Sequence, residues 1–181
     1  MSTRGTQERS VELPQGVTAS LSGRSLSLRG KLGEATKNFD KVNVNLAVDG
    51  NTIRVSPYSE KKRDNVIVNT VLSLLENMVT GVTKGYVYRL KVVYAHFPIS
   101  VKTKDDEIHV ENFIGERSPR VSKIVGACKV TVEGDDVVVK GVSLEDVGQT
   151  AANVELATKI KRKDQRIFLD GVYIYQKGEG W

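Results

Sequence analysis

The sequence predicts an α+β fold made of two copies of one module, each a small antiparallel β-sheet with one α-helix packed on a face. Three observations support this prediction: short stretches of alternating apolar residues, two longer stretches with helical periodicity, and blocks of sequence that recur further along the chain. Val17 aligns with Ile99 and Gly33 with Gly115, so the offset is 99 − 17 = 115 − 33 = 82 residues.

Two further blocks repeat with nearly the same spacing. "VDGNTIRV" matches "VEGDDVVV", and "DNVIVNTV" resembles "EDVGQTAA". Three matched blocks in the same order indicate a duplicated module. We therefore expect an N-terminal α+β repeat over residues 1–82 and a C-terminal α+β repeat over residues 83–181.

The first copy contains two predicted hairpins followed by a helix. Apolar alternation on both sides of a Ser-Gly-Arg turn predicts the first hairpin, and a tight turn at Asp49-Gly50 between "VNVNLAV" and "TIRV" predicts the second. A helix is expected over residues 63–82, with Asp64 as its N-cap. Its predicted core-facing residues share one helical face: Ile67, Val71, Leu74, Leu75, Met78 and Val82.

The second copy repeats this order of elements. Strands are expected near 99–104, 107–111, 127–133 and 136–142, and a helix over about 144–159. Ser143 and Asp146 stand at the spacing of a capping box at the start of that helix. Its predicted buried stripe is short and made of small residues: Val147, Ala151 and Val154.

Composition narrows the functional classes. The 181 residues are 39% hydrophobic, carry a formal net charge of +5 and include one cysteine. No apolar run approaches the roughly 20 residues of a membrane span, and the first residues lack the apolar stretch of a secretion signal, so we expect no membrane partner. A single cysteine forms no internal disulfide, which fits a reducing compartment and a soluble cytoplasmic protein.

The sequence contains no constellation typical of catalysis. His96 and His109 stand at no metal-ligand spacing from each other or from Cys128. The acidic clusters coincide with predicted turns, where aspartate is favoured by local backbone bonding, and no phosphate-binding loop is present. We therefore expect no enzyme, no metal site and no cofactor.

The densest charge cluster follows the second helix. Five cations occur within eight residues: Lys159, Lys161, Arg162, Lys163 and Arg166. A solvated helix end explains one or two of them. Phe168, Asp170-Gly171 and Tyr173 then suggest a turn and strand that hold an extended basic loop on the domain, which favours contact with closely spaced phosphates of a nucleic acid.

Two other cationic stretches are candidate RNA contacts. Lys61, Lys62 and Arg63 precede the first helix. A long loop over residues 112–126 carries Arg117, Arg120 and Lys123. For either stretch, an ordinary surface loop is as good an explanation as a binding element.

Three segments resemble one family. "LPQGVTASLSGRSLSLRGKLGE", "NTVLSLLENMVTGVTKGYVYRLKVVYAHFPISV" and "VVVKGVSLEDVGQTAANVELAT" are similar, in this order, to the universal large-subunit ribosomal protein L-six family. "KDQRIFLDGVYI" and "FIGERSPRV" resemble its archaeal and eukaryotic branch. Together these segments cover nearly the whole chain.

The resemblance implies a non-enzymatic, ribosome-associated protein. It would bind large-subunit rRNA near the sarcin-ricin loop, the stalk base and the translation-factor-binding region, as a monomer beside the ribosomal proteins of the stalk base and near translation factors. The cations of the basic segment would contact phosphates. The implied scaffold positions are Phe168, Gly171 and Tyr173 in the loop, where either aromatic ring could instead stack on RNA. Gly148 and Gln149 of the V-G-Q motif are the other two, and close helix packing is the favoured reason for the glycine.

The residues alone leave one alternative from a different class. A free-standing protein-interaction module could pair its open sheet edges with a partner strand, while the cations serve only solubility. Such a module predicts association that is insensitive to salt.

Overall fold

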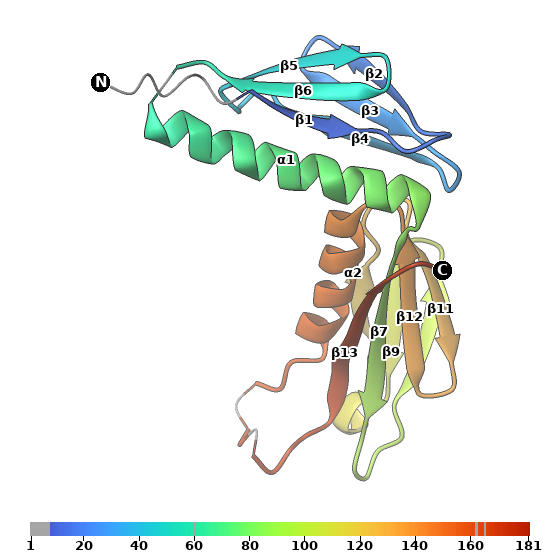
Figure 1. Cartoon of the computed structure of the whole chain (residues 1–181). Coiled ribbons are helices and arrows are strands. Elements are labelled where there is room, and N and C mark those ends of the chain that lie inside the picture. The colour runs from blue at the N-terminus through green and yellow to red at the C-terminus, as the bar shows by residue number, and fades with distance from the viewer. Residues whose placement is uncertain (1–7, 60, 162, 165) are drawn as a thin grey trace. The chain divides into compact units, whose positions relative to one another are not determined.

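The computed structural model describes residues 8–59, 61–161, 163–164 and 166–181 (Figure 1). The chain divides into two compact units, Met1–Lys84 and Gly85–Trp181, referred to below as the N-terminal and C-terminal units. The sequence-based boundary after residue 82 falls in the last turn of helix α1 (Lys62–Thr83). Arg162 lies outside the described residues.

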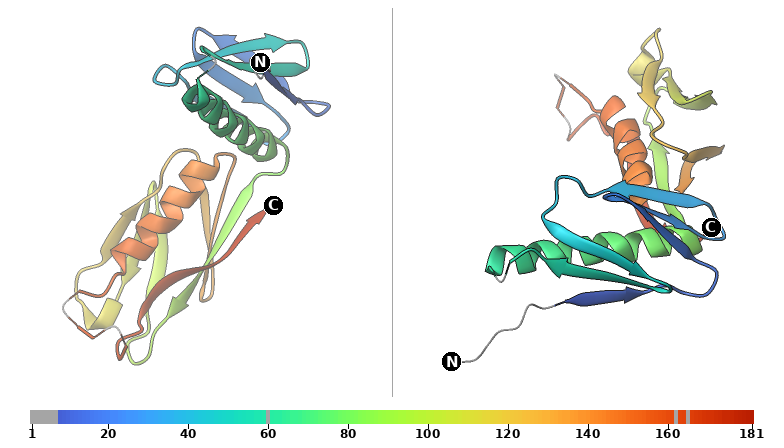
Figure 2. Two further views of the ribbon diagram at one scale, coloured as in Figure 1. Left: turned by 60° about the vertical axis from the view of Figure 1, so that its left-hand side comes forward. Right: turned by 90° about the horizontal axis from the view of Figure 1, so that it is seen from above.

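The N-terminal unit arranges its described strands in two antiparallel sheets. One sheet has the order β1 (Arg9–Glu12), β6 (Thr52–Pro57) and β5 (Val44–Asp49). The other has the order β2 (Thr18–Ser22), β3 (Ser25–Arg29) and β4 (Glu34–Asn38). Helix α1 contacts strands of both sheets (Figure 2). The α+β class with one helix is therefore confirmed, although the strands of the unit form two small sheets where one was expected.

Helix α1 differs from its prediction in two details. Its N-cap is Lys61, which makes no side-chain capping bond, whereas Asp64 lies inside the first turn and accepts a hydrogen bond from the Ser59 hydroxyl. The expected capping role of Asp64 is therefore wrong. The helix turns Val68 into the core, and leaves Ile67 and Leu74 only partly buried. Its buried residues are Val68, Val71, Leu75, Met78, Gly81 and Val82.

Part of the hydropathy of α1 comes from residues that the helix places in the core. With 22 residues it is long and apolar enough to cross a membrane by length and composition, contrary to the expectation from the sequence. However, a continuous face from Val68 to Val82 packs inside the N-terminal unit together with buried strand residues such as Leu28 and Ile53. A core helix of a water-exposed domain has this distribution of apolar residues.

Within the described residues, the C-terminal unit repeats the plan with one extra strand. Its first sheet has the order β11 (Lys129–Glu133), β12 (Asp136–Gly141), β7 (Tyr86–Val93) and β13 (Gly171–Glu179). Its second sheet has the order β10 (Arg120–Lys123), β9 (Glu107–Glu111) and β8 (Ser100–Lys104). Helix α2 (Leu144–Ala157) contacts β7, β12 and β13 of the first sheet and β10 of the second (Figure 1).

Strand register confirms the internal repeat. Ser22 pairs with Ser25 in the first hairpin, and Lys104 pairs with Glu107 in its counterpart, so both partners are shifted by 82 residues (104 − 22 = 107 − 25 = 82). The predicted cap of α2 is also confirmed, because the Ser143 hydroxyl accepts a hydrogen bond from the backbone N–H of Asp146 at 3.2 Å. The predicted stripe of Val147, Ala151 and Val154 is fully buried.

The extra strand β13 makes a loop necessary after α2. It pairs antiparallel with β7, from Gly171 opposite Val93 to Glu179 opposite Tyr86. At its far end Trp181 packs on Gly85, whose φ of 76° and lack of a side chain leave space for the indole ring. The segment between α2 and β13 is residues 158–170, and its described parts, 158–161, 163–164 and 166–170, lie at the end of the unit where α2 finishes (Figure 1). We call this segment the basic loop.

Candidate nucleic-acid interface

The basic loop presents its described cations to solvent. Lys159, Lys161, Lys163 and Arg166 are all exposed. Two of them have partners within the loop: the Arg166 guanidinium donates to both carboxylate oxygens of Asp164 at 3.1 and 2.9 Å, and the Lys163 ammonium lies 4.7 Å from the centre of the Phe168 ring. The bonds from Arg166 lower the pKa of Asp164. The loop therefore carries a concentrated positive charge with some internal order.

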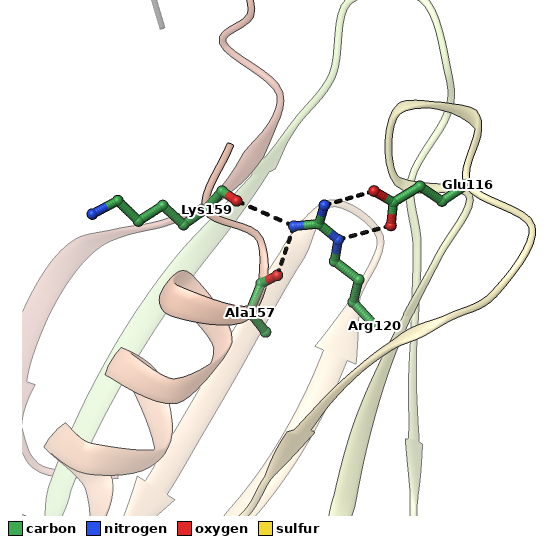
Figure 3. Close-up of polar contacts among 4 residues, drawn as sticks. All are labelled: Glu116, Arg120, Ala157 and Lys159. Carbon is green, nitrogen blue, oxygen red and sulfur yellow. Dashed lines mark hydrogen bonds and ion pairs between the residues drawn. The ribbon is translucent and has the colours of Figure 1, made fainter. Parts of the chain in front are cut away.

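Arg120 clamps the start of the basic loop (Figure 3). One of its terminal nitrogens donates to the backbone carbonyls of Ala157 at 2.9 Å and Lys159 at 3.2 Å. Its other two nitrogens donate to the Glu116 carboxylate at 2.8 and 2.6 Å. The guanidinium also lies 4.1 Å from the centre of the buried Phe113 ring. Arg120 thus donates its hydrogen bonds to other groups of the protein, unlike the described lysines of the loop, and holds the start of the loop in place.

The far end of the basic loop is held by buried polar groups. The Asp170 carboxylate, only 6% exposed, accepts a hydrogen bond from the backbone N–H of Ala95 at 3.0 Å. The Thr158 hydroxyl accepts one from the backbone N–H of Val172 at 3.1 Å, which joins the start of the loop to the start of β13. Sequence reasoning missed Thr158 and read Asp170 only as part of a turn. Burial of a polar side chain is the signal that marks both, and it appears only in the folded chain.

The side chain of Tyr173 lies against Gly171 at the start of β13. The Tyr173 hydroxyl donates to the Leu169 carbonyl at 3.2 Å, so the ring folds back over the loop. A Cβ on Gly171 would come within 2.9 Å of that ring, which explains the glycine. Burial, and then the charges of Asp170 and Glu155, raise the pKa of Tyr173, so its hydroxyl stays a neutral donor.

Gln149 of the V-G-Q motif takes part in a chain of hydrogen bonds that links α2 to the end of β10. The Gln149 amide donates to Asn153 at 2.8 Å, and the Asn153 amide donates to the Lys123 carbonyl at 3.2 Å. Gly148 has space for a methyl group, since a Cβ there would lie 3.9 Å from the nearest atom, on Tyr88. The expectation of close packing at Gly148 is therefore wrong.

The segment predicted as a long loop over residues 112–126 contains strand β10, which pairs with β9, and it begins with a strained turn. Asn112 and Ile114 have φ angles of 58° and 51°, which residues other than glycine rarely adopt, and Phe113 between them is buried. This turn places Arg117 at the surface, and Lys123 is also exposed. The remaining candidates, Lys61, Lys62 and Arg63, are exposed at the start of α1 and belong to the N-terminal unit.

Among the described residues, no group of three or more His, Cys, Asp and Glu side chains is arranged to hold a metal ion. Cys128 is partly buried, and this burial raises the pKa of its thiol. A thiol of this kind is a poor nucleophile. The polar groups that converge in the C-terminal unit instead hold a cationic loop in place.

Comparison with known proteins identifies the family. A family model described as "Ribosomal protein L6" matches residues 13–85 and 97–171. The chain belongs to the ribosomal protein L6 family. Each of the two matched segments covers most of one unit, as expected for a duplicated module.

Archaeal relatives match this ribosomal L6 chain over nearly its full length. The protein "Large ribosomal subunit protein uL6" of Archaeoglobus fulgidus is 46% identical, covering 97% of this chain and 92% of the relative. The protein of the same name from Methanocella arvoryzae is 45% identical, covering 93% and 96%, and that of Staphylothermus marinus is 44% identical, covering 93% and 94%. The resemblance to the archaeal branch is thus confirmed. The L6 protein is a structural, non-enzymatic ribosomal component, and it is cytoplasmic and ribosome-associated.

Acid is expected to weaken the C-terminal unit through the Arg120–Glu116 pair. Hydrogen bonds from Arg120 lower the pKa of Glu116 in the folded chain, so the unfolded chain binds more protons. The resulting stability is complete above the ordinary glutamate pKa of about 4.3 and is lost as pH falls through the lower folded value. Urea midpoints measured from about pH 6 down to pH 3 should therefore fall more for the wild type than for Glu116→Gln. If the urea midpoint fell equally in both proteins, the Arg120–Glu116 pair would contribute nothing to the acid sensitivity.

Proposed function

We propose that this ribosomal L6 protein binds large-subunit rRNA through the basic loop, near the sarcin-ricin loop, the stalk base and the translation-factor-binding region. One observation supports RNA binding above all: Lys159, Lys161 and Lys163 are exposed on a segment fastened at both ends by Arg120 and Asp170. A fastened loop loses less conformational entropy when it meets closely spaced phosphates than a free tail does. The location on rRNA rests on the family resemblance.

Arg117 and Lys123 extend this proposed surface on the segment that Arg120 and α2 hold against the loop. Lys61, Lys62 and Arg63 are a second proposed contact, on the N-terminal unit. As partners we propose the ribosomal proteins of the stalk base, with translation factors close by, and a single copy of the chain per subunit. The names of the archaeal relatives, which are large-subunit proteins, support this assignment.

Replacing Lys161 and Lys163 by alanine is expected to flatten the salt dependence of binding to a large-subunit rRNA transcript. Each neutralised phosphate contributes about −0.7 to −0.9 to the slope of log K against log salt, so the double variant should lose about 1.5 from the slope. The matched control is Lys104→Ala with Lys129→Ala, which removes two exposed cations on the edge strands β8 and β11. We expect the control to change the slope little.

Equal slopes for the wild type and the Lys161/Lys163 variant would overturn the assignment of the loop. Salt-insensitive association with ribosomes would favour the protein-interaction module instead. The location on rRNA has its own test, hydroxyl-radical footprinting of the bound transcript, in which we expect protection at the sarcin-ricin loop and stalk base. Protection elsewhere would contradict the location without contradicting RNA binding.

A further inference from the structure

A half-open cavity of about 360 Å³ lies between the end of α2, the basic loop and β13. Its volume lies within the range of about 300–1,000 Å³ that is usual for small-molecule sites. The lining is mixed: Phe168 and Tyr173 supply aromatic rings, Leu156 and Ile160 supply apolar surface, and Glu155 and Lys159 bring charges of opposite sign. Phosphate binding by the loop requires no such cavity, so its lining calls for a separate explanation.

The aromatic walls are held in place. Tyr173 is tethered through its hydroxyl to Leu169 and rests over Gly171, which has no side chain to displace it. Phe168 is partly buried, and Lys163 lies close to its ring. Planar groups enter such a site by stacking, and every nucleobase has a face that stacks on an aromatic ring.

Glu155 gives the cavity a chemical preference. A carboxylate beside a basic RNA-binding loop repels phosphates, so a plain phosphate-binding surface gains nothing from it. An ionised carboxylate is an acceptor only, with two oxygens that take two parallel N–H donors. Among the four bases, guanine carries two adjacent donors, N1–H and N2–H, on its base-pairing edge.

We propose that this cavity receives one unpaired guanine of RNA, stacked on Tyr173 and Phe168, with its N1–H and N2–H donated to Glu155 and its phosphate beside Lys159. The occupant is RNA because the cavity opens within the cationic loop, and charge complementarity favours a polyanion. This inference rests on the proposed function and adds base recognition to it. The exposed side chain of Leu156 forms an apolar part of the lining, next to Glu155.

The test uses RNA hairpins that share one stem and differ in a single bulged nucleotide: guanine, inosine, adenine, cytosine, uracil or none. The affinity of the full chain for each hairpin is measured at one salt concentration by fluorescence anisotropy. We expect the bulged guanine to bind on the order of tenfold more tightly than the unbulged stem, in line with stacking of one base. Inosine lacks the N2 amino group and should lose part of this gain.

Glu155→Gln separates base recognition from charge. It removes a negative charge, so electrostatics alone would strengthen binding to every hairpin equally. Base recognition instead requires weaker binding to the guanine bulge and unchanged or stronger binding to the plain stem. Because Glu155 is only partly buried on the surface of α2, the substitution is expected to leave the fold intact.

The two proposals fail in different ways. Equal affinity for all six hairpins, with a normal salt slope, would overturn the guanine site and leave the RNA-binding function standing. If Glu155→Gln strengthened binding to every hairpin equally, the guanine site would also be overturned. It would be overturned as well if Glu155→Gln weakened association with ribosomes without changing hairpin binding, since a protein segment would then be the occupant. If the chain showed no salt-dependent binding to the large-subunit rRNA transcript and none to any hairpin, the proposed function itself would be overturned.

Discussion

Replacing Arg120 by alanine is expected to destabilise the C-terminal unit by about 2–4 kcal/mol and to weaken RNA binding at the same time. The substitution removes the ion pair with Glu116 and leaves the carbonyls of Ala157 and Lys159 without these donors. It also removes the cation above the Phe113 ring. The effect is large because one partly buried guanidinium makes all of these contacts.

Urea unfolding followed by the fluorescence of Trp181 measures the stability loss. Trp181 is the sole tryptophan of the chain, and its contact with Gly85 requires β13 to stay paired with β7. Arg117→Ala is the matched control, because it removes the same charge from an exposed position three residues before Arg120. We expect the control to stay within about 0.5 kcal/mol of the wild type.

Arg120→Lys distinguishes a positioning residue from a phosphate contact. Lysine keeps the positive charge but lacks the planar fork that binds Glu116 and the two carbonyls together. If Arg120 positions the basic loop, lysine should restore neither stability nor RNA affinity. Recovery of RNA affinity without recovery of stability would show that the charge itself contacts phosphate, and would contradict the positioning role.

The success of the sequence-based prediction follows from how local each signal is. The hairpins, α2 and its Ser143 cap depend on alternation, periodicity and a cap within three residues, and the repeat provided the hairpin pattern twice. The division of each unit into two sheets depends on pairing between distant strands, such as β1 with β6, which alternation does not encode.

The candidate site shows the same limit. The cationic residues of the basic loop stand next to one another in sequence and were predicted as a group. The groups that fasten the loop are far apart: Arg120 reaches Ala157 across 37 positions, and Asp170 reaches Ala95 across 75. Sequence reasoning therefore placed Arg120 among the RNA contacts, whereas the structure gives its donors to the protein. Asp64 was wrongly predicted to be the N-cap of α1. Its carboxylate instead accepts a hydrogen bond from the Ser59 hydroxyl, which no capping pattern describes.

Two aspartates of the basic loop give opposite expected effects on RNA binding. Each substitution by alanine removes one negative charge, and electrostatics alone would strengthen RNA binding in both cases. Asp164 is exposed and engages Arg166, whose side chain is 90% exposed, so Asp164→Ala should release Arg166 for phosphate and strengthen binding. Asp170 is buried, and Asp170→Ala should weaken binding because it unfastens the end of the loop.

The Asp170 substitution also carries a stability cost. Loss of its charge-assisted bond leaves the Ala95 N–H without this acceptor, which is expected to cost about 1.5–3 kcal/mol. Asp170→Asn keeps an acceptor oxygen without the charge, and should recover most of that stability together with RNA affinity. Affinities for the large-subunit rRNA transcript and urea midpoints, measured on all three variants, test the argument. If Asp170→Ala bound RNA more tightly, as Asp164→Ala should, charge alone would govern the loop, and its fastening at Asp170 would have no part in binding.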